Sequence, residues 1–232
     1  MFDQLDTILK PIGETPSLQN LAYQAIKSSI LSLALPPGKQ LSESDLANSL
    51  KVSKTPVREA LQKLEREGLV QIVPRKGVFV TEFSEREIDE ISEIRSALVG
   101  LACLRAYNNI NEIELEKARK ILEAGDIALR EGNREQWLTI NERFHAWLMR
   151  LADSKQLSLV IEKLDEYFIR IQAVAASVPG ELIESNKEHY AILEALEKHD
   201  PKAASKAAAD HIIQVGKQAV QFYKEFSGLN ND

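Results

Sequence analysis

The most constraining feature of this sequence is the order of local signals in residues 54–80, KTPVREALQKLEREGLVQIVPRKGVFV. Thr55 is expected to be a helix N-cap, with Pro56 at the first helical position and Gly68 at the helix end. Between them, apolar residues recur at the i, i+3, i+4, i+7 spacing of a one-sided helix. Two β-rich runs then flank the turn Pro74-Arg75-Lys76-Gly77, which predicts a hairpin with a basic tip. The apolar positions are Val57, Ala60, Leu61 and Leu64.

Two further helices are expected upstream of this one. Residues 18–34 have helical apolar periodicity, and the helix stops at LPPG because proline cannot continue it. Ser42, with an acidic residue three positions later, resembles a capping box that opens a short helix to about Leu50. Residues 51–53 form a tight link to the next helix.

Helix, helix, tight turn, helix and hairpin in residues 18–82 predict a winged helix-turn-helix domain, preceded by an extension of residues 1–17. An α-helix fits the major groove of B-DNA, where arginine can pair with guanine. The polar face opposite the apolar stripe and the wing tip are therefore expected to contact DNA. A solvated helix face and a charged turn are the alternative. The candidate residues are Lys54, Thr55, Arg58, Gln62, Arg75 and Lys76.

Charge is unevenly distributed along the chain, whose net charge is −6. Residues 18–82 hold nine Lys and Arg against six Asp and Glu, so this block has a net charge of +3. Residues 83–232 have a net charge of −7. The negative net charge of the whole chain argues against nucleic-acid binding, whereas the positive charge of residues 18–82 favours it. The support is weak, because solvated surfaces often differ in net charge by this much.

The sequence also bears on the cellular compartment. Cys103 is the only cysteine, so no internal disulfide can form. The N-terminus lacks the basic-then-apolar pattern of a signal peptide, and no apolar run approaches the ~20 residues of a membrane span. We therefore expect a cytoplasmic protein without a membrane partner.

From Ser84 onward the sequence predicts helices only. Ser84 and Glu87 form a capping box for a long helix that ends near Tyr107. Six helices with short links predict an antiparallel bundle at residues 83–228. The expected fold class is therefore mostly α, with an N-terminal winged helix-turn-helix and an all-α bundle as the effector domain. The other five helices are expected at about residues 111–132, 134–152, 156–176, 181–198 and 201–226.

Three of the four histidines lie on different predicted helices of this bundle. Asn141 and His145 are spaced i, i+4 and share one helix face, whereas His189 and His211 lie on two later helices. Each histidine alone would be an ordinary core or rim residue. Convergence would instead give three imidazoles and one oxygen, a set that suits Zn, Ni or Fe. His199 lies at a helix–helix turn and is expected at the surface.

Residues 35–80 are similar to the winged-helix domain of the GntR family of bacterial transcription regulators. The similarity runs through PPG, LSESDLA, VSKTPVREAL, GLV and GVFV. It implies that the chain binds double-stranded operator DNA. Some family members carry arginine at the position of Ser44, so one contact is expected to be absent here. The matching DNA-contact and wing positions are Lys54, Thr55, Arg58, Arg75, Lys76 and Gly77.

Residues 83–226 are similar to the FCD ligand-binding domain of the FadR subfamily, through NERFH, EHYAIL and AADHI. The resemblance implies a divalent metal such as Zn or Ni, held by Asn141, His145, His189 and His211. Aspartate is common in the family at the position of Asn141. A neutral amide is a weaker ligand than a carboxylate, so we expect lower metal affinity.

The same resemblance implies a small carboxylate effector at the open metal positions. Arg95 matches a recurrent family arginine and is the first candidate for holding the acid, with Arg170 as the second. The family arginine is usually followed by a Leu-Glu pair, whereas here Leu98-Val99 follows. For both arginines the alternative is an ordinary salt bridge.

We therefore expect a dimeric transcription regulator that binds a pseudo-palindromic operator and responds to a carboxylate in a metal-containing cavity. One alternative is a constitutive DNA binder with an inert helical dimerisation domain. A second is a hydrolase in which a His-bound metal activates water, although the attached DNA-binding domain disfavours it. No enzymatic activity is expected.

Overall fold

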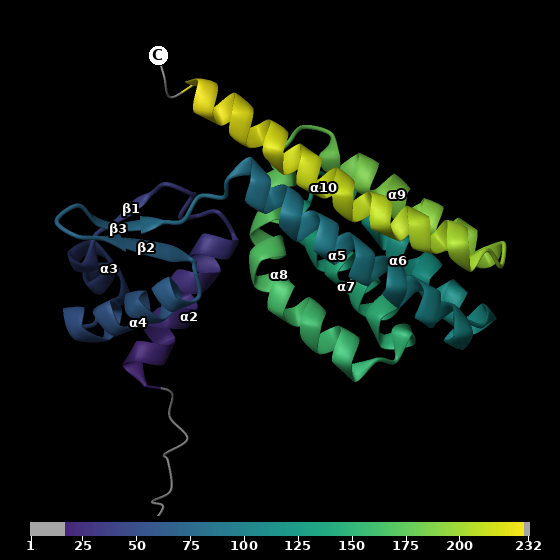
Figure 1. Cartoon of the computed structure of the whole chain (residues 1–232), viewed down its shortest axis with the longest axis horizontal. Coiled ribbons are helices and arrows are strands. Elements are labelled where there is room, and N and C mark those ends of the chain that lie inside the picture. Colours follow the sequence, from purple (N-terminus) through teal and green to yellow (C-terminus); the bar gives the residue numbers. More distant parts are fainter. Residues whose placement is uncertain (1–16, 230–232) are drawn as a thin grey trace, which may run out of the picture. The chain divides into compact units, whose positions relative to one another are not determined.

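The computed structural model describes residues 17–229, apart from the side chains of Glu166 and residues 226–229. The chain divides into two compact units, and the division falls between Glu82 and Phe83 (Figure 1). Nearly all of the expected N-terminal extension, residues 1–17, lies outside the described residues. Helices dominate, as predicted, and none of those described has the length and hydropathy needed to cross a bilayer.

The first unit is the predicted winged helix-turn-helix, with three helices and a small antiparallel sheet of order β1-β3-β2. Its core lies between the helices and the inner face of the sheet, with Ile26, Ile30, Leu61 and Leu64 among the fully buried side chains. The elements are α2 (Leu18–Leu31), β1 (Gln40–Leu41), α3 (Glu43–Leu50), α4 (Lys54–Arg66), β2 (Val70–Val73) and β3 (Gly77–Val80).

The predicted start of α4 was wrong by two residues. Ser53 is the N-cap, without a side-chain cap hydrogen bond, and the helix already includes Thr55 and Pro56. Proline is tolerated throughout the first turn because the N–H groups there have no intrahelical acceptor, so its presence did not locate the first helical residue. The end was predicted correctly, since Gly68 follows the C-cap with a φ of +70°.

The second unit contains the six predicted helices and a short 3₁₀ turn. Ser84 and Glu87 form the predicted capping box at the start of the first helix. Asn111 caps the second helix, as expected, by accepting a hydrogen bond from the backbone N–H of Glu114. The elements are α5 (Glu85–Ala106), η1 (Tyr107–Asn109), α6 (Glu112–Arg130), α7 (Arg134–Ala152), α8 (Lys155–Ala175), α9 (Glu181–Glu197) and α10 (Pro201–Leu229).

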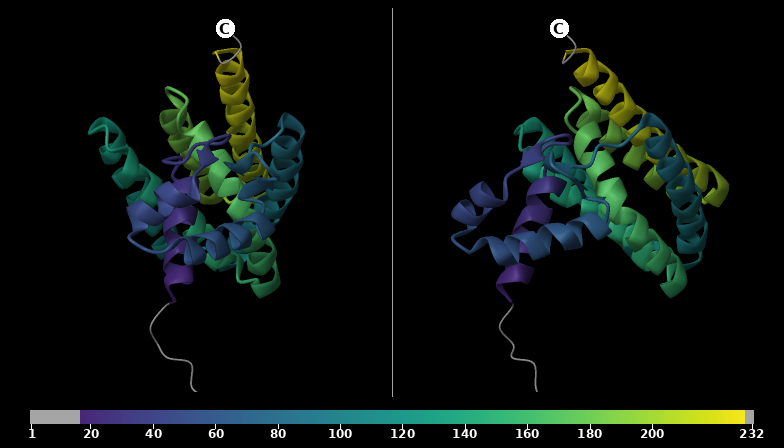
Figure 2. Two further views of the ribbon diagram at one scale, coloured as in Figure 1. Left: turned by 90° about the vertical axis from the view of Figure 1, so that its left-hand side faces the viewer. Right: turned by 60° about the vertical axis from the view of Figure 1, so that its left-hand side comes forward.

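Helices α5 and α10 lie side by side along much of their length, as both views in Figure 2 show. Small residues make this close approach possible. A Cβ at Gly216 of α10 would clash with the side chain of Ser92 on α5. Helices α7, α8 and α9 pack around this pair and bring distant polar residues to the interior of the bundle.

Candidate DNA interface and metal centre

Helix α4 separates its core residues cleanly from its polar residues. The four residues of the predicted apolar stripe are at most 1% exposed. The side chains proposed for DNA contact are exposed on the remaining surface of the helix, and they are Lys54, Thr55, Arg58 and Gln62.

Arg58 is held by a carboxylate from the preceding helix. Its Nε and Nη2 donate to the two oxygens of Glu43 on α3, over 3.1 and 2.7 Å. This hydrogen bonding lowers the pKa of Glu43 below its ordinary value. Because the Arg58 side chain remains 60% exposed, the pair orients the guanidinium without removing it from the surface.

The wing is a tight hairpin whose tip residues are all exposed. Arg75 adopts a φ of +66° and Gly77 a φ of +117°. Positive φ is freely available to glycine and uncommon for other residues. Gln40 of β1 donates through Nε2 to the carbonyl oxygen of Lys76 at 2.8 Å, which braces the tip from the neighbouring strand. Arg75, Lys76 and Gly77 therefore lie together at the end of the hairpin.

The three predicted histidine ligands converge inside the second unit. His145 of α7, His189 of α9 and His211 of α10 have ligand nitrogens that all lie within 4.8 Å of one another. The Nε2 atoms of His189 and His211 are 3.2 Å apart. Two nitrogens bound to one tetrahedral zinc at 2.0–2.1 Å are separated by roughly 3.3 Å, so this spacing suits a shared ion.

The chemical state of the cluster also suits a metal. Burial, together with neighbouring positive charge, lowers the pKa of His145 and His189 well below the ordinary value, so both imidazoles are neutral near pH 7. Metals bind neutral imidazole rather than imidazolium. Phe144 and Trp137 pack against the His189 ring and shield the cluster on one side.

Asn141 supplies the structural test of whether the cluster fits a metal. It lies one turn before His145, is 3% exposed, and its Oδ1 has no hydrogen-bond partner among the described residues. A buried polar atom without a partner is costly. An N–H···N hydrogen bond between His189 and His211 would explain their contact but would leave this oxygen unsatisfied. The three imidazoles therefore fit a metal, and Asn141, one turn before His145 on the same helix, is the candidate for a fourth ligand through its unpaired oxygen.

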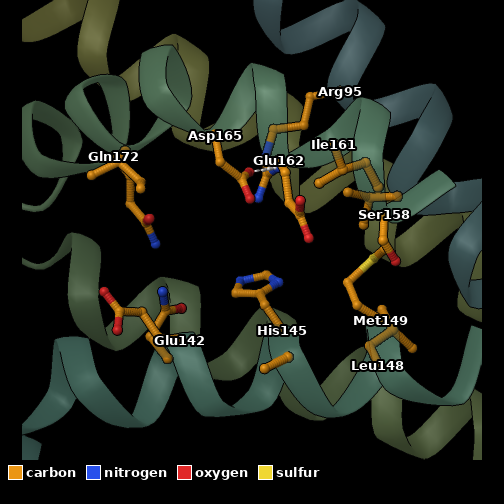
Figure 3. Close-up of a pocket in the computed structure, with 14 residues that line it drawn as sticks. Arg95, Glu142, His145, Leu148, Met149, Ser158, Ile161, Glu162, Asp165 and Gln172 are labelled. Atoms are coloured by element: carbon orange, nitrogen blue, oxygen red, sulfur yellow. Dashed lines mark hydrogen bonds and ion pairs between the residues drawn. The ribbon is translucent and has the colours of Figure 1, made fainter. Parts of the chain in front are cut away.

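A pocket of about 330 Å³ opens onto His145, between α7 and α8, with Arg95 of α5 in its wall. Arg95 donates to Asp165 at 2.5 Å, and its guanidinium lies 4.3 Å from the centre of the Phe168 ring. Figure 3 shows the His145 ring pointing toward this ion pair, with the Glu162 carboxylate beside it. The first effector candidate is thus placed at the expected cavity, already paired with an acid.

Arg170, the second candidate, is not among the residues that line this pocket. Its side chain is buried, and its guanidinium lies 4.3 Å from the centre of the Phe83 ring. Arg170 is therefore better placed to pack against Phe83 than to contact a ligand in the pocket. His199 is exposed at the turn between α9 and α10, as predicted.

Comparison with known proteins decides the family. Residues 18–80 match the family described as bacterial regulatory proteins, gntR family, and residues 90–214 match the FCD domain. The chain belongs to the GntR family. It has the helix-turn-helix and FCD domains of a bacterial transcription regulator, and the comparisons indicate that it is not an enzyme.

Similar regulators extend over most of this GntR-family chain. YdhC of Bacillus subtilis, described as an uncharacterized HTH-type transcriptional regulator, is 30% identical over 82% of this chain and 85% of its own length. The HTH-type transcriptional repressor RspR of Escherichia coli is 27% identical over 95% of this chain and 97% of its own length. The solved structure of E. coli McbR/YncC is similar with a TM-score of 0.69 and 27% identity, and the match covers 91% of this chain and 100% of that one.

The sequence did not identify Glu188 as part of the histidine site of this GntR-family regulator. Its Oε2 lies 2.7 Å from Nδ1 of His211. If Nδ1 carries the proton, it donates to the carboxylate and leaves the Nε2 lone pair directed at the other histidines. Adjacent helix residues usually point to different faces, and Glu188 reaches this site only because α10 packs against α9.

Replacing Glu188 with alanine is expected to weaken zinc binding by about 10- to 100-fold, because His211 loses the acceptor that orients it. Zinc competition against a fluorescent chelator measures the change. Glu184→Ala is the matched control, since Glu184 lies one turn earlier on α9 and pairs with the exposed Lys187. Equal zinc affinity in the two variants would contradict an orienting role for Glu188.

Proposed function

We propose that this GntR-family protein is a ligand-responsive regulator that binds a pseudo-palindromic operator as a homodimer. A small carboxylate, bound in the cavity beside the histidine cluster, changes its DNA affinity. The observation that carries the proposal is the pocket between α7 and α8, which brings Arg95, Asn141 and His145 to one cavity. An inert dimerisation block has no need of convergent buried polar groups with an open pocket.

DNA recognition is assigned to α4 and the wing. Arg58 is expected to read a guanine in the major groove, with Gln62 beside it on the exposed face. Lys54 and Thr55 lie in the first turn of α4, where the helix dipole and free N–H groups favour a phosphate. Arg75 and Lys76 of the wing add sequence-independent phosphate contacts.

Asn141, His145, His189 and His211 are assigned as the ligands of a divalent metal, with zinc or nickel as the best match. A bound metal would supply positive charge and an open position for a carboxylate oxygen. Arg95 lines the same cavity and is expected to hold a carboxylate through its guanidinium. Glu188 keeps His211 in the orientation that the site requires.

An exposed apolar seam on α5 supports the dimer. Ile94, Ala97, Leu101 and Leu104 are all exposed and follow the 3, 4, 3 spacing of a two-helix seam. Leu101 is 47% exposed within this one chain. A second copy of α5 would cover the seam by the symmetric contact typical of homodimers.

Replacing Leu101 with glutamate is expected to convert the dimer to a monomer, because it places a charge in the middle of the seam. Light scattering at several concentrations measures the mass. Ile127→Glu is the control, since Ile127 is 44% exposed on α6, away from the seam. A Leu101 variant that remains as dimeric as the Ile127 variant would exclude the α5 seam.

Helix α8 connects the cavity to the first residue of the second unit. Asp165 and Ile169 on α8 line the pocket, whereas Arg170 and Tyr167 of the same helix contact the Phe83 ring. Phe83 is the first residue of the second unit. A ligand that shifts α8 by binding at Asp165 would therefore also shift Phe83. We expect the affinities for ligand and for DNA to be coupled through this movement.

The DNA-binding function is tested by selecting genomic fragments from the source organism with the full chain. The proposal predicts enrichment of sites with two inverted half-sites about one helical turn apart, centre to centre. Enrichment without sequence preference would reject a specific operator. Fragments with single, unpaired half-sites would reject the dimer while leaving the recognition helix intact.

A further inference from the structure

The pocket of the proposed function is more acidic than a receptor for a simple carboxylate should be. Its ionisable lining consists of one guanidinium, three carboxylates and one histidine. The carboxylates belong to Glu142 of α7 and to Glu162 and Asp165 of α8. With a divalent metal bound, two positive charges bring this lining to about zero, so an acid without a cationic group would leave the cavity negative.

Arg95 is moreover already engaged. Its Nη1 donates to Asp165 at 2.5 Å, and Asp165 forms no other hydrogen bond or ion pair among the described residues. The Asp165 side chain is 35% exposed and its carboxylate faces the cavity in Figure 3. A lone carboxylate that approached Arg95 would therefore meet a like charge beside it, which disfavours binding.

Two of the residues that line the cavity carry a buried polar atom without a hydrogen-bond partner. Asn141 Oδ1 and Arg95 Nε are both buried, and neither has a hydrogen-bond partner among the described residues. Both residues line the same pocket. The Asn141 oxygen is the one assigned to the metal, and the Arg95 nitrogen is a further donor of the guanidinium that does not engage Asp165.

We propose that the effector is a zwitterion, an α-amino acid with an apolar side chain. This inference rests on the proposed function, because it assigns the ligand of the same pocket. Arg95 binds the carboxylate of the ligand, and Asp165 and Glu162 bind its ammonium group. The remaining lining is largely apolar and suits a hydrocarbon side chain; it includes Val99, Leu148, Met149, Ile161 and Ile169.

The ammonium group resolves the conflict at Arg95. An α-amino acid places its positive and negative groups on one carbon, and Arg95 and Asp165 place the complementary charges in direct contact. Each ligand group then meets its opposite charge, and the net charge of the metal-loaded cavity does not change. An α-hydroxy acid offers Asp165 a hydrogen bond but brings a full negative charge, so it is expected to bind more weakly.

Calorimetry on the zinc-loaded full chain tests the proposal with three compounds of one skeleton. They are leucine, 2-hydroxy-4-methylpentanoate and 4-methylpentanoate, and the other natural amino acids are measured with their deaminated counterparts. In the set of compounds that binds best, the amino acid is expected to bind at least about tenfold more tightly than the hydroxy acid or the deaminated acid of the same skeleton. Asp165→Asn should remove this preference, whereas Asp210→Asn, at an exposed acid of α10, should preserve it.

Equal or tighter binding of the compounds that lack the ammonium group would overturn the zwitterion assignment. So would an absence of binding by every amino acid, or an unchanged preference in Asp165→Asn. These outcomes are distinguishable from failure of the proposed function. A deaminated acid that binds through Arg95 and alters operator affinity would retain the regulator and reject only the ligand class.

Discussion

Zinc is expected to raise the melting temperature of the wild-type protein, and His189→Ala is expected to abolish that effect. At free zinc of about 100 times the dissociation constant, binding stabilises the folded state by about 2.7 kcal/mol. For a domain of this size that corresponds to a shift of roughly 5 to 10 °C. The variant loses one of three imidazoles from the cluster. Calorimetric melting with and without zinc measures the difference within each protein.

The His189 comparison requires a control and a second variant because His189 is buried. His199→Ala removes an exposed histidine and should keep the full zinc shift. His189→Gln restores volume and serves if the alanine variant fails to fold. A zinc shift that persists unchanged in folded His189 variants would mean that the ion binds elsewhere, and an absence of any shift in the wild type would reject the metal site.

Arg58→Ala is expected to weaken specific operator binding by roughly 5- to 150-fold, because the guanidinium provides the bidentate base contact. Nonspecific DNA binding should change little, since it depends mainly on phosphate contacts. Fluorescence anisotropy at a fixed salt concentration, on operator and on scrambled DNA, measures both affinities.

The control for Arg58 is Arg119→Ala on α6, which removes another arginine that is ion-paired and partly exposed. It should leave the ratio of specific to nonspecific affinity unchanged. If Arg58→Ala preserves that ratio as well, α4 is not the element that reads sequence. If both affinities fall equally, Arg58 contacts phosphate rather than a base.

Much of the fold follows from local signals in the sequence. The apolar stripe of α4, Gly68 after its end and the Ser84 capping box act within a few residues, so periodicity and capping rules locate the elements. The start of α4 was misplaced because Pro56 is compatible with several positions in a first turn. The two-residue strand β1 carries too little pattern to be recognised and exists only because it pairs with β3.

The candidate site, like the fold, could be predicted from the sequence only in part. The spacing of Asn141 and His145 indicates a shared face, but the sequence could not establish that His189 and His211 meet them. The charged partners of the pocket residues are even further apart in the sequence. Asp165 is 70 residues from Arg95, and neither lies in a motif that links them. Such pairs depend on helix packing, so only the three-dimensional structure shows that Arg95 is already neutralised.

The most direct test of the account is the operator affinity of the zinc-loaded full chain, measured with and without a compound that calorimetry has placed in the pocket. The account predicts that the ligand changes the dissociation constant by at least about fivefold, and that Arg95→Ala removes the change. An unchanged operator affinity at saturating ligand would contradict it. The helical domain would then be an inert dimerisation block attached to a constitutive DNA binder.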